Sequence, residues 1–137
     1  IYTMPVTGKL ILTILLCIYL INAVAQPRKF PSPASADAVA NPLKGNAQAT
    51  LDGKKVYTMY CVTCHGSKGK GDGIAAPGLA KPPADHTSDF VQKQTDGALF
   101  WIITEGNSPM PTYKSTLTET QRWQVVNYIR TLAKKPK

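Results

Sequence analysis

Cys61, Cys64 and His65 form a C-x-x-C-H pentapeptide. Two thiols at this spacing at a helix end can add across the two vinyl groups of one haem, and the adjacent imidazole is then held under the iron. A structural zinc site would need a second ligand pair, and the other candidates are only Cys17, in an apolar segment, and a single His86. A thiol redox pair would need a βαβ context, which the sequence does not indicate. The motif predicts haem attachment, with zinc and thiol redox chemistry as the alternatives.

Length and charge limit the other functions. The chain has 137 residues, which is the size of one small domain with an appendage. A formal net charge of +8 suits a membrane surface, an acidic protein or nucleic acid. The basic residues are not interleaved with aromatic residues on one element, so we expect no nucleic-acid partner. No nucleophile, acid–base pair or phosphate loop is recognisable, so we expect no small-molecule substrate.

Residues 1–26 are predicted to be a membrane anchor. The stretch Leu10–Ile21 is almost entirely apolar, with Lys9 in front of it and the small triplet Ala-Val-Ala at residues 23–25 behind it. The same pattern fits a cleaved signal peptide, which is the alternative reading. Cys17 is interpreted as a small residue packed in lipid rather than as a lipidation site.

Residues 27–49 are predicted to be a flexible linker. They contain four prolines among Ala, Ser and Asn, and their apolar residues follow neither a strand nor a helix period. A linker of this length reaches at most about 75 Å when fully extended. We therefore expect a haem domain at residues 50–137 that swings between partners.

Three helices are expected in that domain, and we predict an all-α fold with long loops. Their apolar spacing and cap residues place them at 50–61 from Thr50, at 98–105 behind Thr95 or Asp96, and from Thr118 onwards with Gln121 completing a capping box. Gly106 ends the second helix. Residues 66–83 form a Gly, Pro and Lys loop that buries little apolar surface, so something other than protein should fill the core.

From Thr50 to Leu132 the chain resembles the class I cytochrome c family. Gly53 and Tyr57 stand eight and four residues before the first motif cysteine, as on the family's first helix, where a glycine lets the terminal helices cross closely. Val125 and Tyr128 occupy the places of the partners on its last helix. The resemblance implies an all-α fold of three main helices around one haem c, attached covalently through the two motif cysteines.

The resemblance also implies the remaining contacts of the haem. Pro77-Gly78-Leu79 resembles the loop whose proline carbonyl accepts a hydrogen bond from the imidazole of His65, so Pro77 and Leu79 are placed in the site. Met110, between two prolines ahead of the last helix, corresponds to the sixth ligand, with a methionine filling a core gap as the alternative. His86 is the rival ligand, with a solvated loop histidine as its alternative.

Aromatic and basic side chains complete the predicted site. Three aromatics, of which we place Trp101 in the site, are expected either to contact the porphyrin and its propionates or to be ordinary core residues: Phe100, Trp101 and Trp123. Four lysines should flank the exposed haem edge and steer an acidic partner, unless they are only a solvated basic face: Lys68, Lys70, Lys81 and Lys114.

Axial ligands on both sides would leave the iron no open position, so the resemblance implies a one-electron carrier and not an enzyme. The expected partners are a quinol-oxidising complex and a terminal oxidase, with the chain as carrier or bound subunit. The alternatives are a donor to a photosynthetic reaction centre and a haem enzyme or sensor with a labile distal ligand. Haem attachment in such families takes place outside the cytoplasm. We therefore expect the haem domain on the periplasmic side of a bacterial cytoplasmic membrane.

Overall fold

The computed structural model describes residues 30–134. Their elements, in chain order, are α2 (Ala34–Asp37), α3 (Ala47–Tyr60), α4 (Val62–His65), the 3-10 turn η1 (Ala76–Gly78), α5 (Asp89–Gln92), α6 (Asp96–Glu105) and α7 (Glu119–Thr131). This part of the chain has no named strand, and its one isolated bridge joins Asn107 and Met110. The all-α prediction is therefore confirmed for residues 30–134.

No helix among these residues is both long and apolar enough to cross a bilayer. The predicted anchor, residues 1–26, lies outside the described residues.

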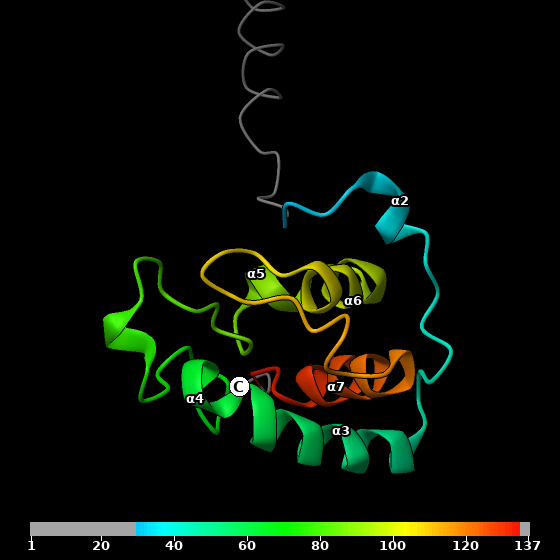
Figure 1. Cartoon of the computed structure of the whole chain (residues 1–137). Coiled ribbons are helices and arrows are strands. Elements are labelled where there is room, and N and C mark those ends of the chain that lie inside the picture. The colour runs from blue at the N-terminus through cyan, green and yellow to red at the C-terminus, as the bar shows by residue number, and fades with distance from the viewer. Residues whose placement is uncertain (1–29, 135–137) are drawn as a thin grey trace, which may run out of the picture.

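The long helices α3 and α7 pack against each other and form the base of the molecule in Figure 1. Gly53 lies at their crossing, where a Cβ atom would collide with the carbonyl oxygen of Gln124. One turn further along α3, the rings of Tyr57 and Tyr128 meet edge to face with centroids 5.0 Å apart. The close crossing expected from Gly53, Tyr57, Val125 and Tyr128 is present, because only glycine allows the two backbones to touch there.

Two helices are capped by residues that the sequence predicts, although α6 begins at Asp96, two residues before the predicted start. Thr95 caps α6 through its hydroxyl, which accepts a hydrogen bond from the backbone N–H of Ala98 at 3.0 Å. Thr118 and Gln121 form both hydrogen bonds of a capping box at the start of α7. Gly106, with φ +79°, ends α6 in a backbone conformation that favours glycine.

The start of α3 differs from the prediction. The helix begins at Ala47, and Asn46 caps it by accepting a hydrogen bond from the Ala49 N–H at 2.9 Å. The predicted cap, Thr50, lies inside the first turn, and its hydroxyl donates to the carbonyl of Asn46. Asn is as good a cap as Thr, and the apolar residues that mark a helix in sequence start only later, at Val56.

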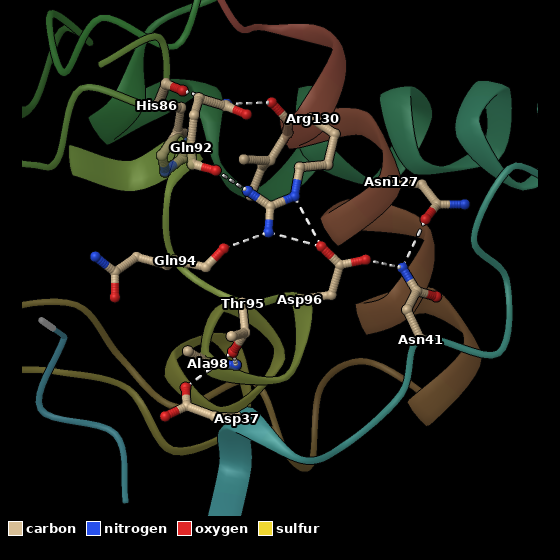
Figure 2. Close-up of polar contacts among 11 residues, drawn as sticks. Asp37, Asn41, His86, Gln92, Gln94, Thr95, Asp96, Ala98, Asn127 and Arg130 are labelled. Atoms are coloured by element: carbon tan, nitrogen blue, oxygen red, sulfur yellow. Dashed lines mark hydrogen bonds and ion pairs between the residues drawn. The ribbon is translucent and has the colours of Figure 1, made fainter. Parts of the chain in front are cut away.

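Residues 30–46, here called the strap, are packed on the domain in this structure, within the range for which the sequence predicts a flexible linker. Figure 1 shows the strap, with α2, running beside α6 and then down to α3. Ala36 is buried against α6 at Gly97, where a Cβ atom would collide with the Ala36 carbonyl. The Asn41 side chain donates to Asp96 of α6 at 3.0 Å and to Asn127 of α7 at 2.8 Å (Figure 2). The strap lacks a regular apolar period. It is ordered instead by hydrogen bonds from its polar side chains to α6 and α7.

Candidate haem-binding site

A cavity of about 470 Å³ lies between α4, α6, α7 and the loops before and after α6. Its volume is that of a site for a small organic cofactor. Five of the seven predicted site residues line it: Cys61, Cys64, His65, Leu79 and Met110. Pro77 and Trp101 are not among its lining residues.

The two thiols are free, half-buried and on the cavity wall. Burial, and to a smaller extent the neighbouring Cys64, raises the pKa of the Cys61 thiol to about 12. A catalytic redox pair requires the opposite, a lowered thiol pKa. Among residues 30–134 no three side chains of His, Cys, Asp or Glu are grouped to hold a metal ion. The described residues thus offer no support for a zinc or redox pair, whereas neutral thiols facing a cofactor-sized cavity suit thioether formation.

His65 is held by a backbone carbonyl. The residue is 8% exposed, and Nδ1 of its ring lies 3.0 Å from the carbonyl oxygen of Ala84. A carbonyl only accepts, so Nδ1 carries the proton and Nε2 keeps its lone pair for a metal. Burial lowers the pKa of His65, and the bond to Ala84 offsets part of that effect. The residue is therefore a neutral imidazole with one free nitrogen, as an axial ligand must be.

The carbonyl partner is a correction to the prediction, which gave that role to Pro77. The backbone N–H groups of Gly73 and Ala75 bond to the carbonyls of Cys64 and Thr63, and this fixes residues 73–75 alongside α4. The following turn, η1, lies at the edge of the molecule with Pro77 exposed. The chain returns to the imidazole only after the later proline pair, Pro82 and Pro83, immediately before Ala84.

His86 lies beside His65 rather than across the cavity from it. The two rings are stacked, with centroids 4.1 Å apart and planes inclined by 18°. Burial, with a smaller effect from the neighbouring His65 ring, lowers the pKa of His86 to about 3, so its ring is neutral at physiological pH. A sixth ligand must approach the iron from the side opposite to His65. The stacked arrangement gives no support to His86 as the rival ligand.

Met110 is on a loop that hydrogen bonds hold to α3 and α6. Backbone hydrogen bonds of 3.0 Å in each direction join Met110 and Asn107. The Tyr113 hydroxyl donates to the carbonyl of Tyr60 at the end of α3, also at 3.0 Å. The Tyr113 N–H donates to the carbonyl of Ile103 in α6. These bonds fix the loop on which the half-buried thioether of Met110 lines the cavity.

Arg122 was not predicted, and it supports the same loop. Its side chain is 8% exposed, and one guanidinium nitrogen donates to the carbonyls of Lys114 and Leu117 at 3.1 and 2.8 Å. It forms no salt bridge within residues 30–134, and its Nε has no hydrogen-bond partner there. One signal was present in the sequence: Arg122 continues the apolar stripe of the last helix, three residues before Val125.

None of the three aromatic residues predicted to contact the porphyrin lines the cavity. Phe100 and Trp123 stack on each other, with centroids 4.0 Å apart, and neither lines the cavity. The α6 residues that do line it are Leu99, Ile102 and Ile103. Trp101 is two positions from Leu99, or about 200° around the helix, so it belongs to the other face.

Three of the four predicted lysines are exposed without an ion pair in the described part of the chain: Lys68, Lys70 and Lys81. Lys81 also lines the cavity. Lys114 differs, because its ammonium group lies 3.4 Å from the carboxylate of Glu105.

Comparison with known proteins gives the same cofactor. The cytochrome c family model matches residues 50–133. A chain of the Kuenenia stuttgartiensis reducing HAO-like protein complex Kustc0457/Kustc0458 is similar, with 28% identity, a TM-score of 0.60 and 77% of this chain covered. This chain spans about half, 52%, of that one. The KustC0563 c-type cytochrome has 29% identity and a TM-score of 0.53, and the match covers 61% of this chain and 99% of that one.

A match of this extent, on a chain whose cavity presents the motif thiols and imidazole, settles the family. It implies electron transfer and redox protein partners. The chain belongs to the cytochrome c family and binds haem c covalently through Cys61 and Cys64.

Proposed function

We propose that this chain is a class I, monohaem one-electron carrier in which His65 and Met110 are the axial ligands. The observation that carries the proposal is that both residues line the cavity that also holds the two motif thiols. When bound, the haem supplies an iron that cycles between ferric and ferrous states, and a thioether ligand favours the ferrous state. The sequence has a single C-x-x-C-H motif, which supports one haem.

The residues of the chain hold this site rigid and largely dry. Ala84 fixes the protonated nitrogen of His65, and the bonds of Tyr113 fix the loop of Met110. Apolar side chains of α6 and α7 form the inner wall, with Leu99 and Val125 only 3% and 1% exposed. A site that moves little when the charge of the iron changes suits rapid electron exchange, because little has to reorganise.

Electrons are proposed to leave where Lys81 meets the cavity, with Lys68 and Lys70 on the preceding loop. Because no carboxylate in the described part of the chain neutralises these lysines, their charge is available to steer an acidic partner. Replacing Lys81 with Glu should slow reduction by an acidic redox protein and flatten its dependence on salt. Lys93→Glu, at an exposed lysine whose partner is Asp89, is the matched control.

We further propose that residues 1–26 anchor the domain on the periplasmic side of a bacterial cytoplasmic membrane, between a quinol-oxidising complex and a terminal oxidase. The apolar run supports the anchor. The packed strap changes the expected reach, because only residues 27–29 separate the anchor from Phe30, a distance of at most about 14 Å between Gln26 and Phe30. The carrier would then meet partners held in the same membrane. Haem that leaves the membrane fraction on carbonate washing would contradict the anchor.

A second candidate is a bound subunit of an oxidoreductase complex, passing electrons to further redox centres. The likeness to a chain of the reducing HAO-like complex favours it, since 77% of this chain is covered by that match. Purification from mild detergent distinguishes the two, because a subunit stays with its complex at high salt and a carrier does not.

Carbon monoxide tests the carrier proposal against a sensor or enzyme with a labile ligand. With both axial positions taken by protein, the spectrum of the reduced protein should change little under carbon monoxide. Rapid and complete conversion to a carbonyl spectrum would contradict the proposal.

A further inference from the structure

Hydrogen bonds hold both the backbone N–H and the backbone carbonyl of His86. Its N–H donates to the carbonyl of Gly69 at 2.6 Å, and its own carbonyl accepts from Nε2 of Gln92, also at 2.6 Å (Figure 2). The next residue, Thr87, is bound through its N–H and its hydroxyl to the carboxylate of Asp85. These bonds leave the His86 side chain little freedom to leave the cavity wall.

The ring of His86 is fixed as well. The residue is 8% exposed, and Nδ1 of its ring lies 3.1 Å from the hydroxyl oxygen of Tyr57, a residue that is only 1% exposed. The same hydroxyl lies 3.3 Å from the carbonyl of Gly66, the residue after His65. A Cβ atom at Gly69 would meet both the Cβ of His86 and the hydroxyl of Tyr57, so there is no spare room around the pair.

His65 is thereby held in two different ways. Ala84 holds the edge of its ring through Nδ1, which fixes which nitrogen is free. A hydrogen bond along the ring edge does little to resist rotation of the ring plane about that bond. The stacked ring of His86, 4.1 Å away and inclined by 18°, covers one face and does resist it.

We propose that His86 is a positioning residue whose ring, held by Tyr57, sets the rotational orientation of the His65 imidazole plane. It does so without binding iron itself. This inference concerns the proximal side of the site only. It does not depend on the electron partner, the anchor or the identity of the sixth ligand.

The orientation of an axial imidazole plane has its own spectroscopic readout. In low-spin ferric haem the direction of the half-filled orbital follows the planes of the axial ligands. The spread and order of the haem methyl proton resonances, and the largest g value of the ferric protein, therefore change when the ring turns. Loss of packing alone lowers the melting temperature without moving either signal.

The test compares ferric holoprotein variants. His86→Ala removes the stacked ring and should change the methyl pattern and the g value, while the reduced and oxidised protein remain low-spin. His86→Phe keeps a stacked ring but loses the bond to Tyr57, so it should restore part of the pattern. Tyr57→Phe should give the same change as His86→Phe, and the double variant no more than either single one, since all three lose one shared interaction.

Thr87→Ala is the matched control, because it loosens the same turn without removing either ring. It should keep the wild-type methyl pattern. A wild-type pattern in both His86→Ala and His86→Phe would overturn the proposal, and so would a Thr87→Ala pattern that matches that of His86→Ala. Conversion of His86→Ala to a high-spin form would show His86 to be a ligand, which also overturns it. If His86→Ala does not fold, Tyr57→Phe and His86→Phe decide the question by the same comparison.

Discussion

Arg130 and Asp96 join α7 to α6 by two contacts to one carboxylate oxygen, with Nη2 at 2.6 Å and Nε at 2.8 Å. Figure 2 shows this pair at the centre of a network, in which Asn41 of the strap bonds to the other carboxylate oxygen. Two further N–H groups of Arg130, on Nη1 and Nη2, donate to the carbonyls of Gln92 and Gln94. One guanidinium thus connects the last helix, the turn before α6 and, through Asp96, the strap.

This network predicts a pH dependence of stability. Burial raises the pKa of Asp96, but the hydrogen bonds from Asn41 and Arg130 outweigh burial and hold it below 3.8. A lowered folded-state pKa contributes stability that is present above the unfolded value and lost as the pH falls through the folded one. Asp96→Asn should therefore lower the free energy of unfolding by about 1 to 3 kcal/mol at pH 7. The difference from wild type should shrink below about pH 4.

Thermal unfolding of both proteins between pH 3 and pH 8 checks this. Asp52→Asn, in the exposed pair with Lys55, is the control and should change the melting temperature far less. If the difference in melting temperature between Asp96→Asn and wild type grows towards low pH, the predicted direction of the pH dependence is contradicted.

The crossing of α3 and α7 predicts that Gly53 tolerates no side chain. Gly53→Val places a branched side chain against the Gln124 carbonyl, and overpacking of this kind costs about 1 to 3 kcal/mol. Gly78→Val is the matched control, because nothing lies within 4 Å of the Cβ position there. Equal melting temperatures for the two variants would show that the helices do not touch at Gly53.

Arg122 is predicted to stabilise the Met110 loop. Arg122→Met removes the donor from the carbonyls of Lys114 and Leu117, and leaving the buried Leu117 carbonyl unpaired should cost about 1 to 3 kcal/mol. Loosening that loop should also increase the fraction of ferric protein that binds added imidazole. Arg122→Lys, which keeps a donor, should lie between Arg122→Met and wild type. Unchanged imidazole affinity in Arg122→Met would show that Arg122 does not stabilise the Met110 loop.

The strap is predicted to be part of the folded domain. Gly97→Val drives a side chain into the Ala36 carbonyl and should detach the strap, which also carries the cavity-lining Phe30. The expected result is faster proteolysis within residues 30–46 and a lower melting temperature. Val39→Ser, at a strap residue that is 48% exposed, should leave both unchanged. If Gly97→Val is no more sensitive to protease than wild type, the strap is not held by its contact with α6, and residues 30–46 would be a free linker.

Local chemistry explains what the sequence could predict. The capping box at Thr118, the end of α6 at Gly106 and the thiols beside His65 each depend on residues only a few positions apart. Trp101 does not line the cavity, and the sequence contains a signal for this, because Leu99, Ile102 and Ile103 share one face of α6 and Trp101 lies on another.

Long-range packing explains what it could not. Two proline-containing segments follow His65, and only the fold determines that Ala84, rather than Pro77, reaches the imidazole. The strap has no period of its own, because its order comes from partners such as Asp96 and Asn127, far away in the chain. The stacking of His86 on His65 could not be predicted for the same reason, because the sequence around a histidine in a polar loop does not indicate which distant residue its ring contacts.

The red end of the ferric absorption spectrum tests most directly whether His65 and Met110 are the two axial ligands. Wild-type protein should show the weak charge-transfer band of a thioether bound to ferric haem. Met110→Ala should abolish that band and lower the reduction potential, while His86→Ala should keep the band. A band that survives in Met110→Ala, or that disappears in His86→Ala, would contradict the ligand assignment.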